Sequence, residues 1–245
     1  MTAPVPLLML HHCGGAAHVF DRLVAALPAD IEPIPHELPG RGRRWREAPL
    51  VHMTQAVADV QAVVARIGRD VAIFGHSMGA YLGIALASHL DRRPGVRCRT
   101  LFVSANAAPS VGRLPCAAPL EVSDAEIFQV AQRSGGAVDS RLRDHPIIGR
   151  STADLLRADF SLSQTFLRQQ PAALTAADIV VLAGTSDVYS HSELASWRHS
   201  TTGACELVWF PGGHFYLNEH PGAVAEAVAA GIRTRITSNQ GDEKL

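Results

Sequence analysis

The amino-acid sequence predicts an α/β fold, in which a mainly parallel sheet is flanked by helices and interrupted by one helical insertion. Strand-like and helix-like stretches alternate along most of the chain, which is typical of a parallel sheet covered by helices. The 245 residues are 47% hydrophobic, and this supplies one sizeable core. Residues 113–172 contain no convincing buried strand, and this break in the alternation marks the insertion.

The first half of the chain supplies four of the expected strands. These are short apolar runs at residues 6–11, 31–38, 71–74 and 100–103. Helices are expected where apolar residues recur at helical spacing, over residues 19–27, 53–67 and 80–90. Thr54 is the expected N-cap of the second of these helices.

The insertion is expected to consist of short helices over residues 124–133, 151–160 and 161–169. Gly135-Gly136 and Pro146 are expected to mark boundaries between these helices. We expect this layer to cover one edge of the sheet as a lid, although a simple helical subdomain would show the same pattern. The core would then comprise residues 1–112 and 173–245.

The alternation resumes after the insertion. Strands are expected over residues 179–183 and 206–210, and helices over 192–197 and 223–232. The polar tail, residues 237–245, is expected to fray.

Composition excludes several classes of protein. Charged residues make up 18% of the chain and the net charge is −1, so the clustered basic excess of a nucleic-acid-binding protein is missing. No apolar run reaches the length of a membrane-spanning helix, and the N-terminus lacks the basic region of a signal peptide. The four cysteines are scattered without metal-binding spacing, so we expect reduced thiols in a cytoplasmic protein.

The strongest motif is Gly75-His76-Ser77-Met78-Gly79, which fits the G-x-S-x-G pattern. It lies between a predicted strand and a predicted apolar helix, which is the context of the nucleophile elbow in the α/β-hydrolase fold. The sharp turn leaves little space for side chains beside the serine, and this explains the glycines. The motif predicts that Ser77 is the nucleophile of a serine hydrolase that cleaves an acyl ester or thioester.

A serine hydroxyl needs a base, and His214 is the best placed of the histidines. It follows the last predicted strand in a glycine-rich loop, at the sheet edge where sites form. His76 adjoins the serine, but its ring should point away on so sharp a turn. His220 directly precedes Pro221, which favours a capping or surface role.

Asp187 is the expected third member of a catalytic triad, because it follows a strand and lies between Ser77 and His214 in sequence. Its carboxylate would orient the His214 ring and stabilise the imidazolium. Asp178 precedes that strand at the wrong edge of the sheet, and Glu193 begins the next helix.

Backbone N–H groups are expected to form the oxyanion hole. One donor is Met78, at the start of the helix that follows Ser77. The second is His12 or Cys13, in the glycine-bearing loop after the first strand. A metal site in this loop is disfavoured because adjacent strand residues point to opposite faces and a fourth ligand is lacking, so no metal or other cofactor is expected.

Five segments of the chain resemble one enzyme family. The segments are LLMLHHCGGAAHVF, HELPGRGRRWREAP, IFGHSMGAYLGIALASHL, LLRADFSL and VWFPGGHFYL. They resemble, in order, motifs of the type II thioesterases that accompany polyketide synthases and nonribosomal peptide synthetases. The resemblance implies the same triad, Ser77, Asp187 and His214. It departs from the family at His11 and Cys13, where a proline and an alanine are usual.

The resemblance further implies an editing enzyme that removes acyl groups from the phosphopantetheine arm of an acyl carrier or peptidyl carrier protein. A product-releasing thioesterase, an acyltransferase or a small-molecule esterase would use the same triad, and a scaffold protein that has lost the chemistry is a further alternative. A monomer is expected, with neither nucleic acid nor membrane as partner.

Two further sets of residues are candidates for substrate contacts. Phe160 and Phe166 of the insertion, with Phe215 beside His214, are expected to contact the acyl chain. Four arginines in one loop, Arg41, Arg43, Arg44 and Arg46, are either a dock for the phosphate and acidic surface of a carrier domain or simply solvated. Four arginines in a loop need no partner, so we favour the second interpretation.

Overall fold

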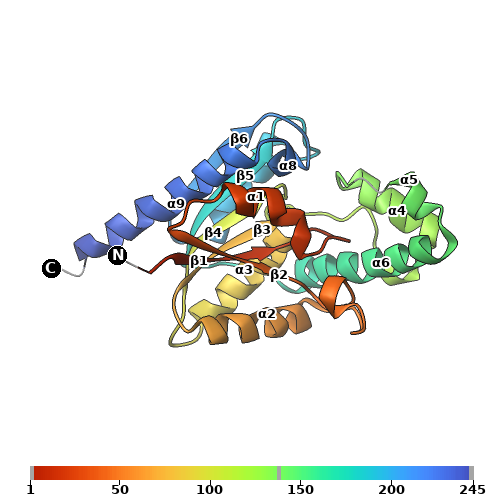
Figure 1. Ribbon diagram of the computed structural model, residues 1–245, viewed down its shortest axis with the longest axis horizontal. Helices are drawn as coiled ribbons and strands as arrows, with labels where there is room; N and C mark the ends of the chain where they lie inside the picture. The colour runs from red at the N-terminus through yellow and green to blue at the C-terminus, as the bar shows by residue number, and fades with distance from the viewer. Residues whose placement is uncertain (1–2, 137–138, 243–245) are drawn as a thin grey trace.

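The computed structural model describes residues 3–136 and 139–242, and within them one six-stranded sheet forms the centre of the molecule (Figure 1). Every strand pairing in it is parallel, and the strand order is β2-β1-β3-β4-β5-β6. The predicted α/β class with a mainly parallel sheet is therefore confirmed. The strands are β1 (Val5–Leu10), β2 (Ile31–His36), β3 (Val71–His76), β4 (Cys98–Ser104), β5 (Asp178–Gly184) and β6 (Cys205–Phe210).

Helices cover both faces of the sheet, which is why the inner strands are apolar on both sides. One face packs against α2 (Met53–Ile67) and α3 (Met78–Asp91). The opposite face packs against α1 (Asp21–Ala26) and α9 (Pro221–Asp242), so the sheet lies between two helical layers (Figure 1).

Short elements complete the core. Trp197 is fully buried, and its indole N–H donates to the Asn106 carbonyl at 2.8 Å. This bond ties the segment between β5 and β6 to the loop after β4. The short elements are η1 (Ala17–Phe20), η2 (Gly42–Arg44), η3 (Pro119–Glu121), α7 (His191–Ala195), η4 (Ser196–Ser200) and α8 (Tyr216–Glu219).

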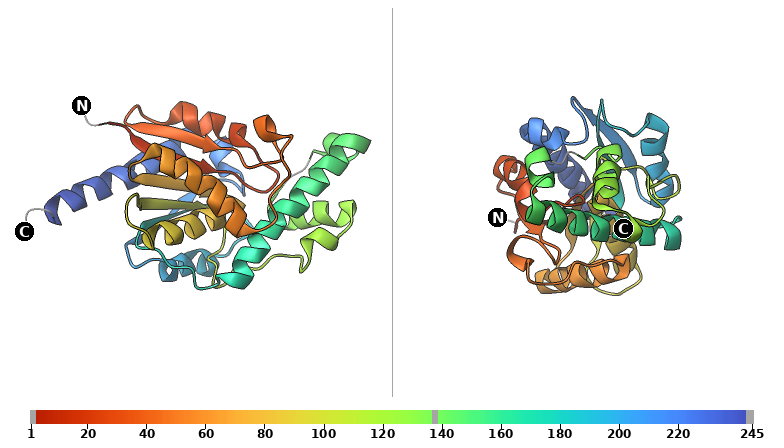
Figure 2. Two further views of the ribbon diagram at one scale, coloured as in Figure 1. Left: turned by 90° about the horizontal axis from the view of Figure 1, so that it is seen from below. Right: turned by 90° about the vertical axis from the view of Figure 1, so that its right-hand side faces the viewer.

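The expected insertion, residues 113–172, contains α4 (Asp124–Arg133), α5 (Ser140–Arg143) and α6 (Pro146–Gln169). Its α4 and α5 and the first turns of α6 lie at the end of the molecule opposite to the two termini (Figure 1). In this part, α4 and α6 share a small apolar cluster that includes Ile127 and Leu156. The last turns of α6 leave this cluster and pack into the main core through Leu162 and Phe166. Figure 2 shows α6 running diagonally from the lid onto the core.

Several expected boundaries are wrong. Residues 151–169 form part of one helix rather than two, because neither glycine nor proline interrupts them. This helix, α6, begins at Pro146, and the ring of its N-cap His145 accepts from two backbone N–H groups. His52, not Thr54, is the N-cap of α2, and the Gln55 side chain accepts from its N–H. The expected helix over residues 19–27 is split into η1 and α1, and α9 continues to Asp242 through most of the tail expected to fray.

Three of the cysteines, Cys13, Cys98 and Cys116, are free thiols, as the sequence led us to expect. Burial raises the pKa of the Cys98 thiol, which makes it an inert core group. Within the described residues, each helix is either too short or too polar to cross a membrane.

Candidate active site

Ser77 lies on a strained turn between β3 and α3, as the elbow motif predicts. Its backbone angles, φ 54° and ψ −116°, are unusual for a residue with a side chain. The turn is held by two neighbours after β4: the Ser77 N–H donates to the Ser104 carbonyl at 2.8 Å, and the Asn106 amide donates to the Ser77 carbonyl at 2.8 Å. The surrounding structure therefore enforces a conformation that costs free energy locally.

The two glycines of the elbow are required by close backbone contacts. A Cβ on Gly75 would lie 2.1 Å from the Gly79 carbonyl oxygen, and a Cβ on Gly79 would lie 2.0 Å from the Leu10 carbonyl oxygen. Both distances are far inside van der Waals contact with backbone atoms that cannot rotate away. The steric reason inferred from the sequence is thus visible at each position.

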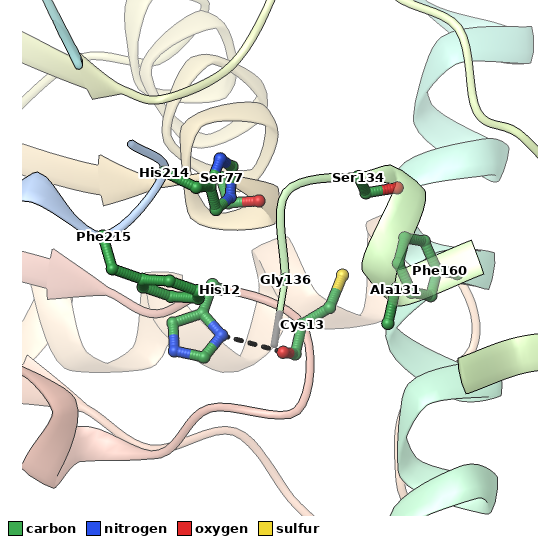
Figure 3. Close-up of a pocket in the computed structure, with 9 residues that line it drawn as sticks. All are labelled: His12, Cys13, Ser77, Ala131, Ser134, Gly136, Phe160, His214 and Phe215. Carbon is green, nitrogen blue, oxygen red and sulfur yellow. Dashed lines mark hydrogen bonds between the residues drawn. The ribbon is translucent and has the colours of Figure 1, made fainter. Parts of the chain in front are cut away.

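His214 and Asp187 form a buried, hydrogen-bonded pair. The His214 Nδ1 lies 3.0 Å and 3.1 Å from the two Asp187 carboxylate oxygens, and the side chains are only 4% and 1% exposed. The Ser186 N–H donates to the Gly212 carbonyl at 2.9 Å, which holds the loops after β5 and β6 together. Since Nδ1 faces the carboxylate, Nε2 is the nitrogen left to act on Ser77. Ser77 and His214 line one pocket (Figure 3).

The competing histidines have other roles. The His76 Nδ1 shares a hydrogen bond with the Ser104 hydroxyl at 2.8 Å, and that hydroxyl contacts the Tyr216 hydroxyl at 2.6 Å. Burial, with His214 and His12 nearby, holds the pKa of His76 well below its usual range. His220 is the C-cap of α8, and its carbonyl accepts the Val224 N–H of α9. Neither residue is among those that line the pocket with Ser77 and His214.

The competing carboxylates are also occupied elsewhere. Asp178 accepts from the Ala204 N–H at 2.7 Å, at the start of β5 and away from the pocket. Glu193 accepts from the Ser190 hydroxyl at 2.6 Å and from its N–H at 2.8 Å, which forms the capping box of α7.

The expected oxyanion donors lie around Ser77. Met78 is the first residue of α3, where backbone N–H groups have no partner within the helix. His12 and Cys13 line the pocket, and the His12 Nδ1 lies 2.8 Å from the Cys13 carbonyl. Burial lowers the pKa of His12 and raises the pKa of the Cys13 thiol, so both side chains are held uncharged.

The metal interpretation of the His11–Cys13 loop finds no support in the side-chain placement. His11 is buried, with its Nδ1 at 2.9 Å from the His12 carbonyl, and burial together with Arg41 lowers its pKa well below the usual range. Across the described part of the chain, three or more histidine, cysteine or acidic side chains nowhere converge as metal ligands would.

The pocket lies between the core and the lid insertion. Figure 3 shows Ser77, His214 and Phe215 of the core on one side and Ala131, Ser134 and Phe160 of the insertion on the other. About 270 Å³ of space, part of it open to solvent, lies between these two sides. Its lining residues are His12, Cys13, Ser77, Ala131, Ser134, Gly136, Phe160, His214 and Phe215.

The turn after α4 packs against His214. Gly135 has φ +85°, and a Cβ built on it would lie 2.7 Å from both Cγ and Nδ1 of His214. The turn is fixed to its own helix by bonds from the Gly135 and Gly136 N–H groups to the carbonyls of Gln132 and Ala131. The sequence indicated only that Gly135-Gly136 separate two helices. The contact of Gly135 with His214 joins segments far apart in the chain, which the local sequence does not reveal.

One of the three expected substrate-contacting phenylalanines is placed differently. Phe160 and Phe215 line the pocket, whereas Phe166 is fully buried in the main core against Tyr81, with ring centroids 5.3 Å apart. Both Phe160 and Phe166 lie on α6, and six helical steps place them about 120° apart around its axis. The prediction for Phe166 is therefore corrected: it is a core residue.

The arginine loop also differs from the preferred interpretation. Arg41 is buried, not solvated, and its guanidinium forms two 2.7 Å bonds with the Asp159 carboxylate of α6. Arg44 is half-buried and bonds Glu47 and Asp59. Arg43 is exposed, as expected of a solvated loop. The partnership of Arg41 with Asp159 is a feature that the sequence interpretation missed, although both residues lie in segments that carry the family resemblance.

The comparison with known families agrees with this geometry. Residues 5–232 match the model of the thioesterase domain, which covers most of the chain. The chain belongs to the thioesterase domain family. The enzyme class expected from the nucleophile elbow is therefore confirmed, and the protein is a thioesterase of the α/β-hydrolase fold.

Relatives of this thioesterase include proteins from antibiotic biosynthesis. It is 33% identical over 218 residues to the thioesterase PikA5 of Streptomyces venezuelae, an alignment that covers 88% of this chain and 76% of PikA5. Among solved structures, it is 32% identical to the type II thioesterase BorB from the borrelidin biosynthetic cluster, with TM-score 0.78 and coverage of 95% and 92%. ClbQ from the colibactin pathway has TM-score 0.85 at 24% identity, with coverage of 96% and 100%, and shares the fold. The expected resemblance to type II thioesterases is confirmed.

Proposed function

We propose that this thioesterase hydrolyses acyl groups from the phosphopantetheine arm of an acyl carrier or peptidyl carrier protein in polyketide or nonribosomal peptide biosynthesis. In that role it clears stalled or mis-primed acyl units. The observation that carries the proposal is that Ser77 and His214, whose ring is paired with Asp187, line one pocket between the core and the helical insertion. The similarity to PikA5 and BorB over most of the chain supplies the biosynthetic context.

The proposed reaction begins with attack by the Ser77 hydroxyl oxygen on the thioester carbonyl carbon, while His214 Nε2 accepts the hydroxyl proton. Asp187 stabilises the resulting imidazolium through Nδ1. The negative charge on the carbonyl oxygen is met by the Met78 N–H and by an N–H of the His12–Cys13 loop. The carbon–sulfur bond then breaks, and the pantetheine sulfur leaves with the proton from His214.

The second half of the reaction releases the acyl group from Ser77. A water molecule gives a proton to His214 and attacks the ester carbonyl, and His214 then returns the proton to the Ser77 oxygen. The products are a carboxylic acid, the carrier with a free thiol and the unchanged enzyme. The turn at residues 134–136 packs on His214, so its position bears on how a pantetheine arm approaches Ser77.

The experiment compares one acyl group on three donors: a phosphopantetheinyl carrier protein, free pantetheine and p-nitrophenol. We expect kcat/KM to be highest with the carrier protein, and the product identified by mass spectrometry to be the free acid. Ser77→Ala is the control for non-enzymatic hydrolysis. Equal kcat/KM on carrier-bound and free pantetheine thioesters would indicate a small-molecule esterase, and an ester or amide product would indicate an acyltransferase.

A further inference from the structure

The buried ion pair between Arg41 and Asp159 joins the loop after β2 to the lid helix α6. Its geometry is bidentate: Arg41 Nη1 donates to Asp159 Oδ2 and Nη2 donates to Oδ1, each at 2.7 Å. The two side chains are 3% and 0% exposed. Removing two charges from water is costly, and a buried pair is weak evidence of a stabilising role. The residues that this pair contacts are therefore the guide to its purpose.

The pair holds the loop expected to form the oxyanion hole. Asp159 Oδ2 accepts the Gly14 N–H at 2.7 Å, and Arg41 Nη1 donates to the Gly15 carbonyl at 3.3 Å. The guanidinium also donates to the Pro39 carbonyl at 3.3 Å, which fixes its direction within its own loop.

The peptide group between Cys13 and Gly14 is consequently fixed at both ends. Its N–H donates to Asp159, and its carbonyl accepts from the His12 ring at 2.8 Å. Since the Gly14 N–H is engaged, the donor to an oxyanion must be the N–H of His12 or Cys13. Fixing the plane of the next peptide restricts the backbone rotation that aims the Cys13 N–H.

The same turn of α6 also forms a wall of the pocket. Phe160, next to Asp159, lines the pocket, and Leu156 lies 3.0 Å from where a Gly14 Cβ would be. The position of α6 and the shape of the loop are thus set by one contact region.

We propose that Arg41 and Asp159 are positioning residues for the oxyanion hole, which orient the His12–Gly15 loop and lock it to α6. The pair does not touch the acyl group and acts only through the loop. The inference rests on the proposed oxyanion role of this loop, and it holds for any acyl donor.

The test uses Asp159→Asn, Arg41→Lys and the double variant Arg41→Met/Asp159→Leu, assayed on a small p-nitrophenyl ester. For each single variant we expect kcat to fall roughly 10- to 100-fold, with KM within about twofold of wild type, because the loop is needed chiefly in the transition state. Affinity for an alkylboronic acid, whose adduct with Ser77 places an oxygen in the oxyanion hole, should fall by a similar factor. The Asp59→Asn variant is the matched control, since it breaks an Arg44 ion pair that does not contact the loop.

The double variant separates positioning from folding. It replaces the buried charges with apolar groups, so thermal stability should return towards wild type, whereas kcat and boronate affinity should stay low. Recovery of kcat together with stability, or single variants with wild-type boronate affinity, would overturn the proposal. Because these measurements need no carrier protein, their failure is distinct from failure of the proposed carrier-directed function.

Discussion

Replacement of Gly135 by alanine would place a methyl group against His214, the proposed catalytic base. The new Cβ would lie 2.7 Å from His214 Nδ1, about 0.7 Å inside the 3.4 Å at which ordinary contact begins. Nδ1 is the atom that bonds Asp187, so relief of the clash moves either the triad or the turn that covers it. A misplacement approaching 1 Å costs on the order of 100-fold in rate, and we expect kcat to fall about 10- to 100-fold.

The matched control is Gly68→Ala at the C-cap of α2. Gly68 also has a positive φ, +66°, but a Cβ there meets nothing within 4 Å. Both variants should lose about 1–2 kcal/mol of stability through the left-handed backbone conformation. Only Gly135→Ala should slow ester hydrolysis and the labelling of Ser77 by a small fluorophosphonate. Wild-type kcat and labelling rate in Gly135→Ala would refute the reasoning that this turn packs on His214.

Three further predictions concern the triad, the pocket wall and acidity. By analogy with other serine hydrolases, Ser77→Ala should lower kcat about 10⁶-fold and Asp187→Asn about 10⁴-fold. The circular dichroism spectra of both variants should be unchanged. Turnover near the wild-type rate in Ser77→Ala would exclude the mechanism. Phe160→Ala should raise kcat/KM for long acyl groups relative to short ones. Phe166→Ala should cost about 3–5 kcal/mol of stability and leave the ratio of kcat/KM for long and short acyl groups unchanged. The same ratio in both variants would contradict the assignment. The lowered folded-state pKa of His76 means that the unfolded chain binds more protons below about pH 6.5, so stability should fall as pH drops from 7.5 to 5.5. His76→Asn should weaken that dependence in urea titrations, and an equal slope would show that His76 does not contribute.

The proposed triad could be selected from the sequence because each of its residues has a distinctive local context. Ser77 lies in a motif whose glycines have a steric reason, and His214 and Asp187 each follow a strand at the same sheet edge. Chain order then reduced the choice among the histidines and acids to one of each. The hydrogen bond between His214 and Asp187 has the geometry that this ordering implies.

Features that depend on contacts between distant segments could not be predicted in this way. Arg41 and Asp159 are 118 positions apart, and an arginine in a polar loop gives no sign that a carboxylate will cover it. The placement of Phe166 depends on the helical phase of the continuous α6, which two separate helices over residues 151–160 and 161–169 would not fix. Gly135 illustrates the same limit, because its contact with His214 joins the insertion to the last strand loop.

Because α6 is continuous, the helix and the turn after α4 are expected to differ in how far they can move. At about 1.5 Å per residue, its 24 residues form a rod roughly 36 Å long, and its far end is buried in the main core. Bending it would break its own backbone hydrogen bonds, so we expect the wall that it supplies at Phe160 to move little during turnover. The short turn at residues 134–136, which packs on His214, lies outside this rod. We therefore expect substitutions at Phe160 to alter chain-length preference and substitutions in the turn to alter the environment of His214, each without the other effect.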